Sequence, residues 1–125
     1  MRFIIHHHSG EKSGTDHLDF MIETESGLAT WRVAVEDMTR LRNGESVPAQ
    51  KIADHRKEYL SYEGPVSHDR GKVSIVDTGG HELLVSDSET MKYALFGKVL
   101  IGYLLISRVS GDIFSFRFGE NLLKP

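Results

Sequence analysis

The chain has 125 residues, no cysteine and a formal net charge of −3 at pH 7. This length predicts a single domain, residues 1–125, with enough chain to bury a core without disulfides. The absence of cysteine excludes a disulfide framework and a thiolate zinc site. The acidic charge argues against strong non-specific binding to nucleic acid, although it does not exclude an enzyme that binds one phosphate at a time.

The N-terminal residues, Met1 to His6, lack the long apolar core of a signal peptide. The longest apolar run, residues 99–106, is broken by Gly102 and is too short to span a bilayer. We therefore expect a soluble, cytoplasmic, monomeric protein that does not bind membranes.

Two strands are predicted at the start of the chain. The first covers Phe3 to His8 and ends in three consecutive histidines. After a loop rich in glycine and serine, the second covers His17 to Thr24, where apolar and polar residues alternate as in a half-buried strand. Its apolar residues face one side, and His17 and Asp19 face the other.

The remaining segments also read mainly as strands. One helical segment is predicted at residues 36–42, ended by Asn43-Gly44, and Asp77 to Gly80 predict a turn. Trp31 is the expected core anchor. Turn signals recur about every ten residues, which favours a small barrel or sandwich that is all-β with minor α content. The further predicted strands are residues 28–35, 47–53, 58–62, 72–76, 82–85, 93–96, 100–109 and 113–118.

A metal site is the first functional hypothesis. Two residues of strand separate His17 and Asp19 by roughly 6–7 Å, so both side chains can reach one ion. A histidine from the first strand would complete a His–His–carboxylate set with positions left open for water or substrate. The alternative is that both residues are solvated polar side chains on the wet face of a strand.

Eight segments carry a family resemblance by their order and spacing. They include the strand from His17 to Glu23, the Trp31 strand, and the run from Asp54 to Tyr59. Together they resemble the 3′-phosphoesterase domain of bacterial DNA ligase D and its stand-alone relatives, from Arg2 to about Val109. The eight segments are residues 2–6, 17–23, 28–33, 54–59, 62–64, 70–73, 92–97 and 102–109.

The resemblance implies a closed or nearly closed β-barrel of about eight strands. Members of the family use manganese to remove 3′ phosphates and 3′ ribonucleotides from primer ends in DNA repair. Imidazole and carboxylate ligands also suit zinc or another transition metal, so the ligand types do not fix the ion. The implied partners are a nucleic-acid 3′ end or a smaller phosphoester, and ligase or polymerase repair proteins.

The same resemblance implies the site residues. His8, His17 and Asp19 occupy the metal-ligand positions, and His6 is the alternative to His8 because the first loop is about three residues longer here. His55 and Tyr59 match residues that contact the phosphate and support catalysis. If both lay on a strand, they would face the same way, since an even number of positions separates them.

Three positions depart from the family pattern. The family has an arginine where this chain has Met21, a lysine where it has Val35 and a glutamate where it has Ala53. The first two are cations that bind the phosphate, and the loss of one such contact typically costs about 100-fold or more in rate. Neighbouring residues that could substitute for them are Arg32, Arg56, His68 and Arg70.

Three functions remain open on these grounds. The first is a metal-dependent 3′-phosphoesterase with an altered phosphate clamp. The second is a degenerate barrel that binds metal or nucleic-acid ends without turnover. The third is an interaction module of a repair complex. We interpret His68 and His81 as surface polar residues, and Arg40 and Arg42 as part of a solvated face.

Overall fold

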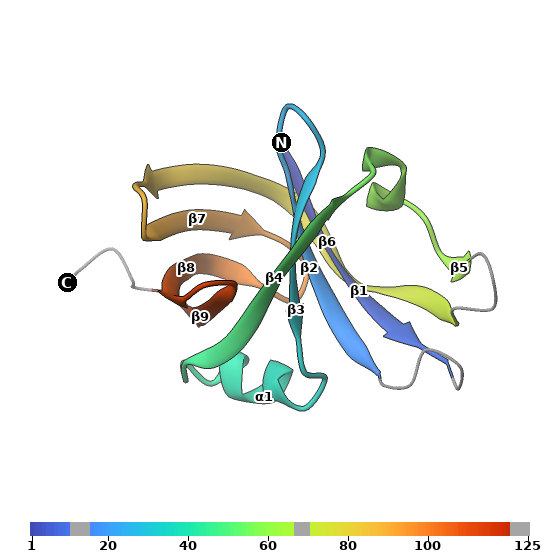
Figure 1. The fold of residues 1–125 in the computed structure, drawn as a ribbon, viewed down its shortest axis with the longest axis horizontal. Coiled ribbons are helices and arrows are strands. Elements are labelled where there is room, and N and C mark those ends of the chain that lie inside the picture. Colours follow the sequence, from blue (N-terminus) through green and yellow to red (C-terminus); the bar gives the residue numbers. More distant parts are fainter. Residues whose placement is uncertain (11–15, 67–70, 121–125) are drawn as a thin grey trace.

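The strands of the protein close into a barrel. The computed structural model describes residues 1–10, 16–66 and 71–120, and Figure 1 shows the fold. Within these ranges the sheet order is β1-β2-β3-β4-β9-β8-β7-β6-β5, and pairing of β1 with β6 closes eight strands into a ring. All the pairings are antiparallel, and the predicted all-β barrel is confirmed. The strands are β1 (Arg2–Ser9), β2 (His17–Glu23), β3 (Leu28–Val33), β4 (Val47–His55), β5 (Gly64–Pro65), β6 (Lys72–Ser86), β7 (Thr90–Phe96), β8 (Ile101–Ser110) and β9 (Ile113–Gly119).

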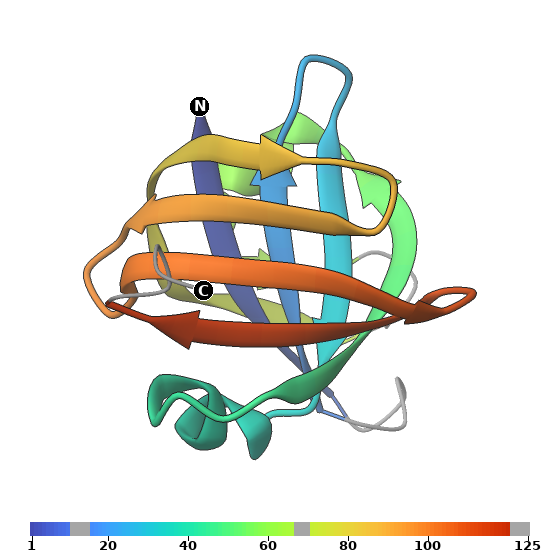
Figure 2. The same cartoon turned by 90° about the vertical axis from the view of Figure 1, so that its left-hand side faces the viewer.

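Two short helices accompany the strands in the described ranges. Helix α1 (Asp37–Arg42) lies below one end of the barrel (Figure 2), and Asn43 ends it as predicted. The 3-10 helix η2 (Lys57–Leu60) follows β4. Neither helix has the length or the apolar character that a membrane-spanning helix needs.

The barrel interior is the main hydrophobic core. Leu18, Phe20 and Ile22 point into it, as the alternation along β2 predicts. Trp31 is only 2% exposed and packs edge-to-face against Phe116, with ring centroids 5.9 Å apart. The interpretation of Trp31 as a core anchor is therefore confirmed.

The outer face of β1, β2 and β3 is also covered. Ile4, Met21 and Leu28 form a second buried cluster there, and Tyr59 and Leu60 of η2 pack against it. Figure 1 shows η2 and β5 beside these strands, away from β7, β8 and β9. The alternative that His17 and Asp19 are solvated on a wet face of the strand is wrong, because the chain after β4 folds back across this face and both residues are buried.

The prediction of a strand at residues 58–62 is wrong, because the 3-10 helix η2 forms there. Tyr59 and Leu60 are neighbours in sequence, and both pack against the cluster on the outer face. Adjacent residues of a strand point to opposite faces, so a strand could not place both side chains there. The backbone turns instead, with the Tyr59 N–H donating to the Arg56 carbonyl at 3.0 Å.

The turn predicted at Asp77–Gly80 is also wrong, because β6 runs without a break from Lys72 to Ser86. Gly79 allows the backbone at the end of β7 to lie close to β6, since a Cβ on Gly79 would overlap the carbonyl oxygen of Phe96. The buried Asp77 carboxylate accepts the backbone N–H groups of Lys98 and Leu100, each at 2.8 Å. These residues thus join β6 to the β7–β8 connection.

Candidate active site

Strand register brings the candidate residues together on the outer face of the barrel. His8 of β1 pairs directly with His17 of β2. Two positions along, Asp19 of β2 lies between His6 of β1 and Arg32 of β3. Paired residues have Cβ atoms about 4.5–5.5 Å apart. These pairings therefore bring three histidines, one aspartate and one arginine from three adjacent strands onto the same face.

His8, His17 and Asp19 form a candidate metal-ligand group. One ligand atom from each residue lies within 4.8 Å of the others, and the rings of His8 and His17 have centroids 4.8 Å apart. His17 and Asp19 are 7% and 3% exposed. The structure therefore brings together the three residues that the sequence predicts, while His6 lies outside this group.

The buried atoms of this group fit a metal ion. His17 Nε2 and Asp19 Oδ1 have no hydrogen-bond partner among the described residues, and their mutual distance of 3.5 Å is long for one. Buried polar atoms are nearly always hydrogen-bonded, because leaving them unpaired costs free energy. A bound cation would satisfy both atoms, and nitrogen and carboxylate ligands suit Mn²⁺ or Zn²⁺.

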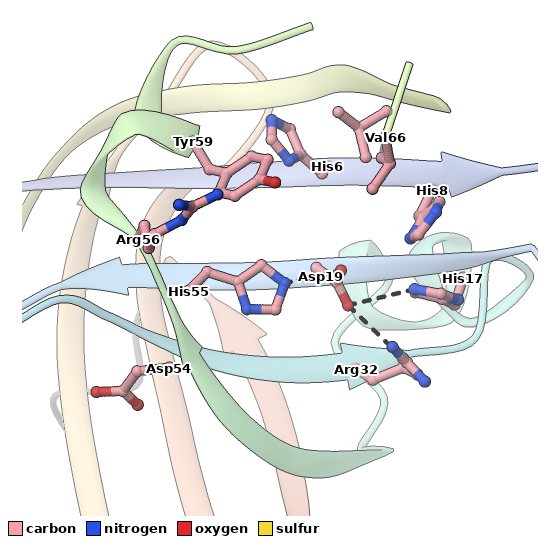
Figure 3. A pocket seen from close by; sticks show the side chains of 11 residues that line it. His6, His8, His17, Asp19, Arg32, Asp54, His55, Arg56, Tyr59 and Val66 are labelled. Atoms are coloured by element: carbon pink, nitrogen blue, oxygen red, sulfur yellow. Dashed lines mark ion pairs between the residues drawn. The ribbon is translucent and has the colours of Figure 1, made fainter. Parts of the chain in front are cut away.

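The ligand group lies at one side of a pocket of about 520 Å³. Figure 3 shows its lining, with Asp19 near the centre and His55 and Tyr59 on one side. The pocket volume is sufficient for a small phosphoester. The residues that line it are His6, His8, His17, Asp19, Arg32, Asp54, His55, Arg56, Tyr59, Val66 and Val73.

Asp19 is the electrostatic centre of the pocket. Burial alone would raise the pKa of its carboxyl group, but the imidazoles of His17 and His55 hold that pKa well below its usual range. Its oxygens lie 3.5 Å from His17 Nε2 and 3.6 Å from His55 Nε2. Asp19 is therefore an anion, as a metal ligand must be.

His55 is placed to act as an acid. The Asp19 carboxylate raises the pKa of His55 against the opposing effect of burial. His55 Nδ1 lies 3.2 Å from the Ala53 carbonyl oxygen, so Nδ1–H donates to it and Nε2 faces Asp19. An imidazole held in this way can carry a proton near neutral pH and deliver it from Nε2.

Tyr59 reaches the pocket from η2 rather than from a strand. Its ring lies edge-on to His55, with centroids 5.9 Å apart, and edge-on to Tyr62 at 5.6 Å. The expectation that a shared strand makes His55 and Tyr59 face the same way is wrong, because β4 ends at His55. The turn of η2 nevertheless brings both side chains to one pocket.

His6 is a pocket residue that sequence reasoning treated only as an alternative to His8. It is 1% exposed, its Nε2 has no hydrogen-bond partner among the described residues, and burial lowers its pKa. Its ring centroid is 6.3 Å from that of Tyr59. Its position two residues before His8 on one strand was the available signal, because both side chains then share a face.

The positions that lack the family cations do not line the pocket. Met21 is 0% exposed and belongs to the cluster under η2, and Val35 packs against the barrel core. Ala53 is exposed on β4. Arg32 and Arg56 do line the pocket, whereas His68 and Arg70 lie outside the described residues.

The remaining surface interpretations have mixed outcomes. Arg40 lies at the surface and pairs with Asp37 at 3.0 Å and with Glu45 at 3.6 Å, as expected of a solvated face. The interpretation of His81 as a plain surface residue is wrong. Its ring is half-buried against Tyr93, and its Nε2 lies 2.9 Å from the Glu23 carbonyl oxygen.

Comparison with known proteins identifies one family. Residues 6–108 match the model of the DNA Ligase D 3′-phosphoesterase domain. None of the curated proteins matches the chain. The matched range runs from β1 into β8 and contains every residue that lines the pocket.

Proposed function

The chain belongs to the DNA ligase D 3′-phosphoesterase domain family, and we propose that it is a metal-dependent hydrolase of phosphate esters at nucleic-acid 3′ ends. The observation that carries the proposal is the group of His8, His17 and Asp19, whose ligand atoms lie within 4.8 Å of one another beside a pocket. We further propose a role in DNA end repair alongside ligase or polymerase partners, which membership of this family supports.

His8, His17 and Asp19 would hold the ion, and Mn²⁺ is the one that we expect. A divalent ion bound there supplies a Lewis acid for a phosphoryl oxygen and for the attacking water. The burial of His17 and Asp19 keeps competing water away from these ligands and strengthens their electrostatic interactions.

His55 and Tyr59 act on the substrate in this proposal. The protonated imidazole of His55 donates its proton to the leaving 3′ oxygen, which lowers the cost of releasing an alkoxide. The Tyr59 hydroxyl donates a hydrogen bond to a phosphoryl oxygen. The Asp19 carboxylate raises the pKa of His55, and this shift toward the protonated imidazole supports its part.

The phosphate clamp differs from the family pattern. Two apolar residues, the buried Met21 and the partly buried Val35, occupy the positions of family cations. Each missing charge contact is worth roughly 3 kcal/mol of transition-state stabilisation. We therefore expect slower turnover than in relatives with both cations, unless another cation contributes.

The missing cations and the net charge of −3 favour a second candidate function. This is a barrel that binds metal, or nucleic-acid ends at low affinity, without hydrolysing them. The two candidates share the metal site and differ in turnover.

A primer–template with a 3′ phosphate tests the proposal. Phosphate release is measured with Mn²⁺ for the parent protein, for His8→Ala and for His7→Ala. His7 is the matched control, because it neighbours His8 but faces away from the pocket and pairs with Asp16 at 3.3 Å. Release by the parent and by His7→Ala, but not by His8→Ala, supports the phosphoesterase. Metal binding without phosphate release supports the second candidate. If the protein neither binds metal nor releases phosphate, the interaction module is the function that remains.

A further inference from the structure

Among the residues that the structure describes, two arginines line the pocket, and their surroundings differ. The Arg56 side chain is 77% exposed, and its Nε lies 2.8 Å from Glu58 Oε1. A neighbouring carboxylate thus already neutralises its charge at the pocket mouth. The Arg32 side chain is 44% exposed, and its Nε lies 3.7 Å from Asp19 Oδ1. That carboxylate also faces His17 and His55, so Arg32 retains much of its charge for a ligand.

The barrel fixes the direction of the Arg32 side chain. Trp31 and Val33, its neighbours on β3, are buried in the core, so alternation sends Arg32 to the outer face. Arg32 pairs in register with Asp19 on one side and with Gln50 on the other. Figure 3 shows its guanidinium beside Asp19 and His17, at the edge of the metal-ligand group.

We propose that Arg32 binds two terminal oxygens of a phosphate monoester and makes the pocket select monoesters over diesters. The inference rests on the proposed function and assigns the substrate selectivity of that site. A guanidinium is planar, and its fork of N–H donors matches two oxygens on one phosphorus atom. Arg32 Nε lies 3.7 Å from Asp19 Oδ1, which is beyond hydrogen-bond distance, so the ion pair leaves the N–H donors of the guanidinium to form this fork.

The selectivity follows from counting oxygens and charges. A phosphate monoester has three terminal oxygens and carries a charge near −2 at neutral pH, whereas a diester has two and carries −1. A monoester that presents one oxygen to the group of His8, His17 and Asp19 keeps two for Arg32. A diester in the same position keeps only one, so it loses a charge-assisted hydrogen bond and half of the attraction.

The competing explanation is that Arg32 only neutralises the buried Asp19. In that case its loss would lower the stability of the fold without changing how the protein ranks two ligands. Removal of a cation beside the metal ligands should also leave Mn²⁺ affinity equal or higher, because one repulsive charge is gone. If the loss of Arg32 weakens phosphate binding but does not weaken Mn²⁺ binding, Arg32 binds the ligand and is not only a structural partner of Asp19.

The test uses thymidine 3′-monophosphate and its methyl ester, which differ by one blocked oxygen. Calorimetry measures both affinities, with and without Mn²⁺, for the parent, Arg32→Gln, Arg32→Lys and the control Arg117→Gln, which removes an exposed arginine of β9 that does not line the pocket. We expect the parent and the control to bind the monophosphate at least about tenfold more tightly than the ester. Arg32→Gln should lose most of this ratio, and Arg32→Lys should keep part of it, since lysine retains the charge without the fork.

The outcomes separate this inference from the proposed function. An unchanged ratio in Arg32→Gln overturns the role of Arg32 and leaves the phosphoesterase standing. If the ratio of the two affinities depends on Arg32 but the protein releases no phosphate from a primer, the role of Arg32 is supported and the proposed phosphoesterase activity is overturned. A parent that binds neither probe overturns both. Melting curves and Mn²⁺ titration of each variant show whether the fold and the metal site are intact.

Discussion

Asp19 and Arg32 lie directly opposite each other on β2 and β3, with Arg32 Nε 3.7 Å from Asp19 Oδ1. Asp19 is buried at the floor of the pocket, and Arg32 is half-exposed at its edge. The pair thus places a carboxylate suited to a cation beside a guanidinium suited to a phosphate. The pairing of β2 with β3 therefore places the metal-binding part of the candidate site next to the phosphate-binding part.

The first prediction concerns metal binding. Asp19→Asn, which keeps the size of the side chain, should weaken Mn²⁺ binding by more than about tenfold, because it removes the charged ligand. Calorimetry with Mn²⁺ measures this change, and His7→Ala should bind Mn²⁺ like the parent protein. Equal affinity in Asp19→Asn and the parent would place the metal elsewhere.

The pH dependence of metal binding provides a second prediction. An imidazole must give up its proton before it can bind a metal. Mn²⁺ affinity should therefore fall as the pH is lowered, because protons compete with the ion for the imidazole nitrogens. Calorimetry in a series of buffers tests this, and an affinity that stays constant down to about pH 5 would argue against histidine ligands.

His55 yields a prediction about stability in the metal-free protein. Its folded-state pKa is raised by Asp19, so the pair stabilises the fold fully below the unfolded-state pKa of about 6.5. This contribution is lost as the pH rises through the higher folded-state pKa. The free energy of unfolding that His55→Gln loses should therefore be larger near about pH 5.5 than near pH 9. Urea titrations at both pH values measure it, and the opposite order would contradict the raised pKa.

Restoring the family arginine should not restore the phosphate clamp. Met21 is 0% exposed and packs with Ile4 and Leu28 beneath η2. In Met21→Arg a charge would be buried in an apolar cluster, so we expect a loss of several kcal/mol in stability rather than a faster enzyme. Thermal melting and phosphate release together test this expectation. A stable and faster variant would show that position 21 reaches the pocket.

The barrel closure can be tested at Gly79. A methyl group on Gly79 would overlap the Phe96 carbonyl oxygen, where the β7–β8 connection crosses β6. Gly79→Ala should therefore lower the midpoint of thermal unfolding clearly, while Gly80→Ala, whose Cβ would meet its nearest atoms only at 3.8 Å or beyond, is a milder control. Equal melting temperatures would contradict the close crossing.

Local pattern was sufficient to predict the core of the site. The two-residue period of a strand places His17 and Asp19 on one face, and the family order adds His8. The same alternation placed Trp31 in the core. These features depend on residues a few positions apart, which is the distance over which hydrophobic periodicity is informative.

Features that depend on distant segments could not be predicted in this way. The face that carries Asp19 is buried because η2, about forty residues later, folds across it, and nothing in β2 itself signals that cover. Tyr59 and Leu60 resemble part of a strand until the buried cluster that holds both is known. Gly79 resembles a turn residue until its close approach to the Phe96 carbonyl oxygen is known.

The proposed activity depends most directly on whether one metal ion drives phosphate release. The measurement is a titration of Mn²⁺ into chelator-treated protein, with phosphate release from a 3′-phosphorylated primer followed at each step. We predict no release before Mn²⁺ is added, saturation near one Mn²⁺ per chain, and no release at any Mn²⁺ concentration for Asp19→Asn. Release by the chelated parent, or undiminished release by Asp19→Asn, would contradict the account.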